Sequence, residues 1–231
     1  MTFVQKLRVA EVYLAKADKK LAPVIKSSGP CRLKPHKDHY GELVGSIVGQ
    51  QLSAKAGSTI WRRVLALFND KMPTPEQLLK IDGQKLRDAG CSWPKVGYMK
   101  DLAQHIIDGR LDLDHVSTMP NDQLIEQLTA VKGIGEWSAH MFMMFGLGRL
   151  DILPVGDLGI RKAIQKLYPI KNSLTSQGIS NGTSKPVPLP TPEQIITIAN
   201  KNKWHPYESV ACWYLWQSLD NSPTKETRHT V

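Results

Sequence analysis

Residues 128–162 have the sequence LTAVKGIGEWSAHMFMMFGLGRLDILPVGDLGIRK, and the expected fold follows from this stretch. A first apolar helical run ends near Val131, and a second begins at Glu136. Gly133-Ile134-Gly135 lies between the two runs. After an extended connection, a third helix is predicted to begin at Asp157, because apolar residues follow it at helical spacing. The stretch therefore predicts three successive helices, of which the first two are joined by a tight turn.

The two glycines of this turn have a structural and a functional interpretation. Glycine adopts positive φ without a Cβ clash, so Gly133 and Gly135 permit a tight reversal with Ile134 pointing inward. Without side chains in the way, the amides that open the next helix can approach a phosphate, and the helix dipole favours an anion there. An ordinary helical hairpin with a glycine C-cap explains the same pattern. Both interpretations are open at this point.

Asp157 also has two interpretations. An aspartate directly before a helical run is a good N-cap, because its carboxylate accepts hydrogen bonds from the first-turn amides. A capped aspartate is also held firmly as an anion, which suits a reaction whose transition state builds up positive charge. Cleavage of a glycosidic bond, with its oxocarbenium-like sugar, is such a reaction. The pattern predicts the cap and permits the catalytic role.

Motifs along the chain resemble those of the helix-hairpin-helix DNA glycosylases, and within them the 3-methyladenine DNA glycosylase II family. They are V-K-G-I-G-x-W from Val131, D-x-x-P-x-x-D-L-x-I-R-K from Asp151, G-Q-Q-L-S at 49–53 and W-H-P-Y at 204–207. The resemblance covers roughly residues 36–217. It implies an enzyme that flips alkylated purines, of the 3-methyladenine and 7-methylguanine type, and excises them in base excision repair. The family's catalytic aspartate falls on Asp157.

Trp137 occupies the position at which lyase members of this superfamily carry a nucleophilic lysine. An indole cannot form a Schiff base, so the resemblance implies a monofunctional hydrolase that leaves an abasic site and does not cut the strand. Taken alone, Trp137 would be a core residue, but with the motif a wall for stacking the flipped base is favoured. The other base-pocket residues that the resemblance implies are Met141, Trp204 and Tyr207.

The resemblance also implies which residues contact DNA. The loop expected to face the minor groove contains Gln50, Gln51, Leu52 and Ser53. Gln51 or Leu52 would fill the gap left by the flipped nucleotide, whereas the alternative is a polar turn between helices. Phosphate contacts are expected of the hairpin turn and of lysines that could equally be solvated: Lys55, Lys95, Lys132, Gly133, Ile134 and Gly135.

No cofactor is expected to be required. The family often binds a monovalent cation, Na⁺ or K⁺, through hairpin carbonyls, which in this chain would be those of Thr129, Val131 and Ile134. The expected partner is double-stranded DNA with alkylated bases, bound by a monomer that does not associate with membranes.

Composition agrees with a polyanionic partner. The 231 residues include 30 Lys and Arg against 21 Asp and Glu, a formal net charge of +9. Three dispersed cysteines predict a reducing compartment and exclude a four-cysteine iron–sulfur cluster. No apolar run approaches the length of about 18 residues that a membrane span needs, and no signal peptide is visible. We therefore expect an intracellular protein located with the DNA, in a bacterial cytoplasm or a eukaryotic nucleus.

We predict an all-α fold, because no sustained alternation of apolar and polar residues appears along the chain. The resemblance implies two helical subdomains that flank a DNA-binding cleft, with Asp157 facing the cleft. Residues 36–147 would form the central subdomain, and 1–35 with 148–220 the second. Residues 221–231 are expected to form a disordered tail.

One residue departs from the family's pattern. Relatives usually carry Arg after the aromatic residue of the W-x-P-aromatic motif, whereas this chain carries Glu208. The reversal of charge removes whatever contact the arginine makes. It keeps open an alternative function, a non-catalytic binder of abasic or distorted DNA on the same fold.

Overall fold

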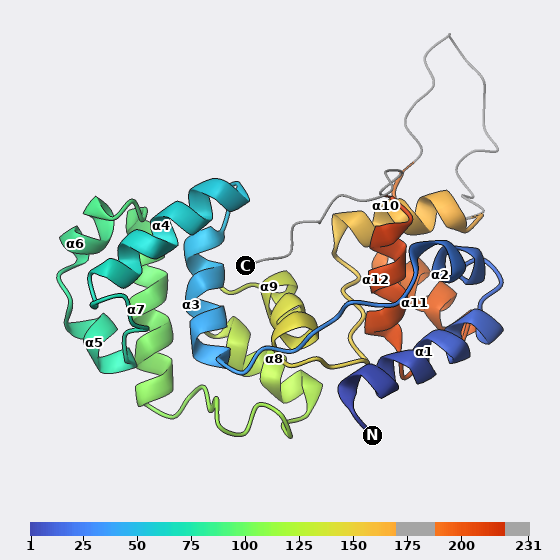
Figure 1. The fold of residues 1–231 in the computed structure, drawn as a ribbon, viewed down its shortest axis with the longest axis horizontal. Coiled ribbons are helices and arrows are strands. Elements are labelled where there is room, and N and C mark those ends of the chain that lie inside the picture. Colours follow the sequence, from blue (N-terminus) through green and yellow to red (C-terminus); the bar gives the residue numbers. More distant parts are fainter. Residues whose placement is uncertain (170–187, 220–231) are drawn as a thin grey trace, which may run out of the picture. The chain divides into compact units, whose positions relative to one another are not determined.

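The structure is a computed structural model that describes residues 1–169 and 188–219. Within these ranges every regular element is helical, which confirms the predicted all-α class (Figure 1). In chain order the elements are α1 (Phe3–Ala17), α2 (Ala22–Ser28), α3 (His39–Gly49), α4 (Ala54–Ala66), α5 (Pro75–Lys80), α6 (Gly83–Asp88), α7 (Trp93–Ile107), α8 (Asn121–Thr129), α9 (Glu136–Met141), the π-helical turn η1 (Phe142–Gly146), α10 (Leu158–Leu167), α11 (Pro192–Lys201) and α12 (Glu208–Gln217).

The chain forms two compact units. The central unit is Lys34–Gly148, and the terminal unit combines Met1–Leu33 with the described residues from Arg149 onward. The predicted central subdomain, 36–147, starts two residues later and ends one residue earlier than this unit. The predicted tail, 221–231, lies outside the described residues.

Helix starts follow the capping residues that the sequence supplies. Thr74, Ser53 and Asp157 each accept a hydrogen bond from a first-turn amide of the helix that follows. In the central unit, α3 packs against α4 and α7, and α5 packs along α7. The loop between α3 and α4 therefore lies within one helical bundle.

A buried carboxylate organises the core of the terminal unit. Asp18 Oδ2 accepts hydrogen bonds from Trp204 Nε1 at 2.7 Å and from the Tyr168 hydroxyl at 2.5 Å. Its Oδ1 accepts the backbone amides of Lys20 and Leu21. Asp18 and Trp204 are both fully buried. Trp204 is therefore a core residue, and its predicted place in a base-stacking pocket is wrong, because its ring has no exposed face and its N–H is already bonded.

The three cysteines are reduced and buried. Burial raises the pKa of Cys31 to about 12, and it also raises the pKa values of Cys91 and Cys212 above that of an ordinary thiol. Their thiol groups act as packing atoms. Among the described helices, none is long and apolar enough to cross a membrane.

The Asp18 cluster generates a stability prediction. Asp18→Ala leaves the Trp204 and Tyr168 donors buried without an acceptor, so the free energy of unfolding should fall by about 2–4 kcal/mol. Asp82→Ala is the control, because Asp82 is exposed and only caps α6 through the Gln84 amide, a loss of about 1 kcal/mol. Urea unfolding measures the loss in the free energy of unfolding for both variants. Equal losses would contradict the central role of Asp18 in this core.

Candidate functional site

The turn between α8 and α9 has the tight geometry expected of its glycines. Gly133 has a φ of +83°, and the Ile134 amide donates to the Val131 carbonyl at 3.1 Å. A Cβ added to Gly133 would overlap the ring of Tyr98 on α7. Glycine is therefore required here both for the positive φ and for the close approach of Tyr98. Ile134 is buried, as predicted. Gly135 instead has an extended backbone as the N-cap of α9, with no atom close to an added Cβ.

Trp137 follows this turn as the second residue of α9. Its side chain is 54% exposed, so it is not a core residue. Met141 lies four residues later and therefore on the same face of the helix. The helix predicted to begin at Glu136 is α-helical only to Met141 and continues as the π-helical turn. Trp137 and Met141 thus present an aromatic ring and a thioether next to the glycine turn.

The probing loop, which we define as residues 49–53, joins α3 to α4 by a type II turn. The Leu52 amide donates to the Gly49 carbonyl at 3.1 Å, Gln50 has φ −50° and ψ 132°, and Gln51 has φ +58°. Gln51, Leu52 and Ser53 are exposed. A leucine that is 38% exposed at the tip of a turn is available to a partner rather than to the core.

Gln50 and Lys95 have roles inside the protein that the sequence did not predict. Gln50 Nε2 donates to the Gly133 carbonyl at 2.8 Å. Lys95 Nζ donates to the carbonyls of Val48 and Gln50, both at 2.7 Å. Desolvation lowers the pKa of the Lys95 ammonium below its ordinary value. The predicted phosphate contact of Lys95 stays a prediction, but Lys95 is not a freely solvated lysine, because its ammonium caps the end of α3.

Asp157 begins α10 in the terminal unit, as its N-cap. Oδ1 accepts the Ile160 amide at 2.7 Å and Trp216 Nε1 at 2.9 Å, and the residue is 9% exposed. Gly159 makes this approach possible, because an added Cβ would lie 2.8 Å from the Trp216 ring. The predicted N-cap is confirmed, and the carboxylate oxygen is held from two directions.

Trp216 is the contact of this site that sequence analysis missed. It lies 59 residues after Asp157, among several aromatic residues of α12. No local pattern distinguishes it from Trp213. The only signal is Gly159 in the first turn of α10, which indicates a close approach without identifying its partner.

Comparison with known proteins identifies the family. The model of the HhH-GPD superfamily, described as base excision DNA repair proteins, matches residues 44–189. The chain belongs to this superfamily. A Bacillus halodurans DNA-3-methyladenine glycosidase of known structure is 37% identical, with a TM-score of 0.76 over 91% of this chain and 89% of that one. The predicted membership of the helix-hairpin-helix glycosylases is therefore confirmed.

Two relatives from Schizosaccharomyces pombe are similar along nearly their whole length. A 3-methyladenine DNA glycosylase solved in complex with abasic DNA is 29% identical, with a TM-score of 0.71 over 90% of this chain and 95% of that one. An alkylbase DNA glycosidase-like protein is 28% identical over 90% of this chain and 92% of the relative.

The two aromatic residues of the W-x-P-aromatic motif were both expected at the base pocket, and both make packing contacts inside the terminal unit. The Tyr207 ring meets Tyr13 of α1 edge-on, with ring centroids 5.2 Å apart. Its predicted pocket role stays a prediction. Glu208 Oε1 lies 3.0 Å from His205 Nδ1, and its buried Oε2 has no hydrogen-bond partner among the described residues. Glu208, which stands where the family pattern has arginine, thus carries a buried oxygen without a hydrogen-bond partner among the described residues.

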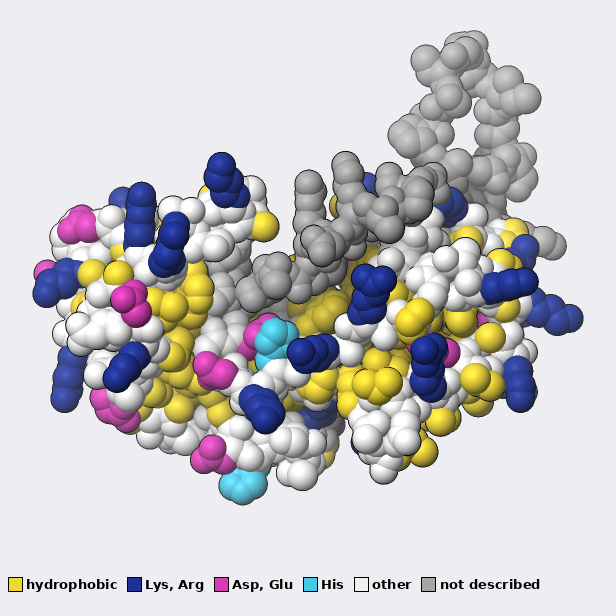
Figure 2. Space-filling view, in the orientation of Figure 1, with side chains coloured by type: hydrophobic (Ala, Val, Ile, Leu, Met, Phe, Trp, Pro, Cys, Tyr) yellow, Lys and Arg dark blue, Asp and Glu magenta, His cyan; other side chains and the backbone are white. Residues whose placement is uncertain are grey.

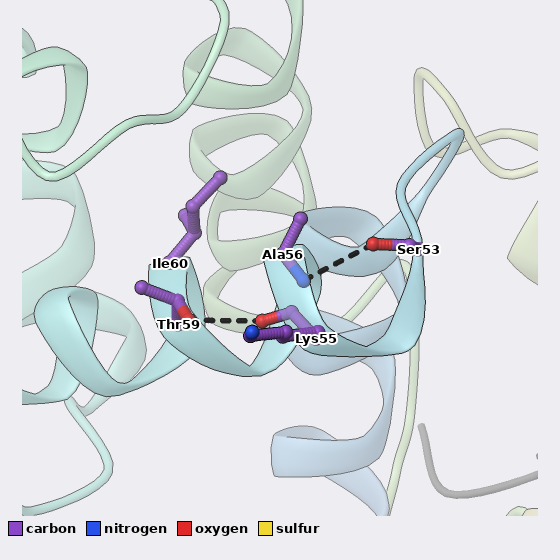
Figure 3. A pocket seen from close by; sticks show the side chains of 5 residues that line it. All are labelled: Ser53, Lys55, Ala56, Thr59 and Ile60. Atoms are coloured by element: carbon purple, nitrogen blue, oxygen red, sulfur yellow. Dashed lines mark hydrogen bonds between the residues drawn. The ribbon is translucent and has the colours of Figure 1, made fainter.

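The remaining lysines predicted to meet phosphates are exposed. Lys55 lies in the first turn of α4 and lines a pocket together with Ser53, Ala56, Thr59 and Ile60 (Figure 3). Ser53 caps this helix by accepting the Ala56 amide at 3.3 Å. The Lys132 side chain is 77% exposed, with Nζ 3.7 Å from Asp101 Oδ1. On the face in Figure 2, Lys and Arg side chains are scattered among other residue types, so charge alone does not locate a DNA-binding surface in this view.

The carbonyls predicted to hold a monovalent cation belong to the α8–α9 turn. The Val131 carbonyl already accepts the Ile134 amide, which leaves one of its two lone pairs. Neutral carbonyl oxygens are hard ligands suited to a cation of low charge. Among the described residues, no group of His, Cys, Asp or Glu could form a metal centre.

The turn geometry predicts different outcomes for its two glycines. Gly133→Ala forces a left-handed backbone on alanine and a clash with Tyr98, so it should lower the free energy of unfolding by about 2 kcal/mol or more. Gly135→Ala meets no atom and should cost about 1 kcal/mol or less. Chemical denaturation compares the two variants. A Gly135→Ala variant as unstable as Gly133→Ala would contradict the positive φ of Gly133 and its contact with Tyr98 as the reason for the difference.

Proposed function

We propose that this chain is a monofunctional DNA glycosylase that removes alkylated purines, of the 3-methyladenine and 7-methylguanine type, from double-stranded DNA and leaves an abasic site. One observation carries the proposal: in an HhH-GPD protein, the carboxylate of Asp157 is fixed at a helix start by the Ile160 amide and the Trp216 indole. Its similarity to glycosylases that are named for 3-methyladenine supports the substrate class.

The chemistry needs little acid catalysis. An alkylated purine carries positive charge, so it is already a good leaving group, and cleavage leaves a sugar with oxocarbenium character. A carboxylate that cannot turn away stabilises that cation without reorganising during the reaction. Asp157 would provide this stabilisation and orient the attacking water. Trp137 and Met141 would stack on the flipped cationic base, for which an electron-rich indole face is well suited.

DNA would be held by the glycine turn and by the start of α4. The amides of Gly133, Ile134 and Gly135, helped by Lys132, would receive phosphates of one strand. Ser53 and Lys55 would contact the backbone near the probing loop, whose Gln51 or Leu52 would occupy the space of the flipped nucleotide. The protein would act as a monomer in the compartment that contains the DNA.

A monovalent cation is part of the proposal for the glycine turn. The carbonyls of Thr129, Val131 and Ile134 would hold Na⁺ or K⁺, and the ion would add positive charge where the turn receives a phosphate. No cofactor would be needed for base release itself. The orientation of the predicted DNA-binding cleft relative to Asp157 stays a prediction.

A second candidate is a non-catalytic binder of abasic or distorted DNA. The observation that favours it is Glu208, because an acidic residue with a buried, unsatisfied oxygen replaces the arginine of the family pattern. The Asp157–Trp216 contact favours catalysis, since capping α10 needs only the Ile160 amide, whereas the indole N–H also fixes the carboxylate.

Release of free base from a methylated duplex distinguishes the two candidates. The native chain should release 3-methyladenine or 7-methylguanine, and Asp157→Asn should reduce the rate about 100-fold or more, because the anion is lost. Asparagine is as good an N-cap as aspartate, so the variant should remain folded. No release by either protein, with tight binding to an abasic duplex, would favour the non-catalytic binder. Equal rates of base release by the native chain and Asp157→Asn would show that the Asp157 carboxylate is not needed for cleavage.

Borohydride trapping tests the monofunctional character. Reduction with borohydride during turnover should yield no covalent protein–DNA complex, because Trp137 stands where a lyase carries its lysine. A bifunctional glycosylase/lyase treated in parallel supplies the positive control. A trapped complex with this chain would assign it lyase activity.

A further inference from the structure

We propose that Lys95 is a positioning residue that sets the conformation of the probing loop and thereby the direction in which Gln51 and Leu52 point toward DNA. The proposal rests on the proposed function, because it assigns the loop tip to the distorted duplex. It starts from an unusual turn, a lysine whose ammonium donates to two backbone carbonyls, and a hydrogen bond from the loop to the glycine turn.

The turn is of a type that its own residues do not favour. Type I and type II turns differ by a half-rotation of the peptide between their two central residues, here the Gln50–Gln51 peptide. Type II requires a positive φ at the third residue, where glycine is preferred, yet the residue is Gln51 at +58°. A Gln-Gln pair would fit a type I turn without strain. Something outside the loop must therefore select type II.

Lys95 supplies that selection. Its Nζ donates to the Gln50 carbonyl, which is the oxygen whose direction reverses between the two turn types. The same ammonium also donates to the Val48 carbonyl, so it is fixed at the end of α3. Rotation of the Gln50–Gln51 peptide would break a charge-assisted hydrogen bond of 2.7 Å in a partly desolvated place. The type II turn, with Gln51 left-handed, is thereby retained.

The loop is also connected to the glycine turn between α8 and α9. Gln50, whose backbone carbonyl Lys95 holds, donates its side-chain Nε2 to the Gly133 carbonyl at 2.8 Å. Gly133 in turn lies against Tyr98, one turn after Lys95 on α7. The two segments proposed to contact DNA therefore share one set of hydrogen bonds, and α7 supports both of them.

The chain contains a matched control for Lys95. Lys100 lies five residues later on α7, and its Nζ donates to the carbonyls of Leu79 and Ile81, at 3.1 and 2.8 Å. It caps the end of α5 as Lys95 caps the end of α3, but it holds no part of the probing loop. Lys100→Met and Lys95→Met thus remove the same kind of interaction from the same helix, and only one of them releases the loop.

The first experiment measures binding of the native chain and both variants to two fluorescent duplexes, one undamaged and one with a tetrahydrofuran abasic analogue, over a range of salt. Lys95→Met should weaken binding to the abasic duplex about tenfold or more relative to Lys100→Met. Binding to undamaged duplex and the salt dependence should stay unchanged. Equal weakening on both duplexes with a shallower salt dependence would make Lys95 a phosphate contact and overturn the proposal.

Identical behaviour of the two lysine variants would also overturn it, because Lys95 would then have only a stabilising role. Base release from methylated DNA by the native chain is measured alongside. If no base is released while the abasic-specific loss in Lys95→Met remains, the proposed catalytic function fails and the positioning role stands.

A second measurement follows the turn itself and does not depend on DNA. Gln51→Gly relieves the left-handed strain only where the turn is held as type II, so it should raise the melting temperature more in the native background than in Lys95→Met. Lys100→Met should show the native response. The same shift in all three backgrounds would show that Lys95 does not set the turn.

Discussion

One carboxylate oxygen joins two helices of the terminal unit. Oδ1 of Asp157 accepts a hydrogen bond from the Ile160 amide in the first turn of α10. It accepts a second from the indole N–H of Trp216 in the last turn of α12. The contact is possible because Gly159 has no Cβ in the path of the indole. The structural and the catalytic interpretations of Asp157 are therefore not alternatives. The bonds that cap the helix are also the bonds that would fix the anion for chemistry.

Features that depend on neighbouring residues could be predicted from the sequence. The cap at Asp157, the reversal at Gly133 and the inward direction of Ile134 all arise from residues within one turn of each other. The absence of a period-two pattern likewise predicted the helical class correctly. Each of these inferences uses backbone stereochemistry or periodicity, which act over a few residues.

Features that depend on distant partners could not be predicted. Trp204 was expected at a pocket, but its indole N–H donates to the buried carboxylate of Asp18, 186 residues earlier. Trp216 was not predicted as a site residue, but its indole N–H donates to a carboxylate 59 positions earlier. Lys95 was expected at a phosphate, and its ammonium is bonded to the Gln50 carbonyl 45 residues before it. A motif indicates which residue type stands at a position, but the partner of that residue is set by tertiary packing.

The burial of the three cysteines has a consequence if the proposed substrate is the right one. The agents that methylate purines are electrophiles, and the thiolate of a cysteine is a strong nucleophile that would compete for them. Cys31, Cys91 and Cys212 are buried and have raised pKa values, so very little thiolate forms at neutral pH. Burial thus lowers the reactivity of all three thiols toward the reagents that create the proposed substrate.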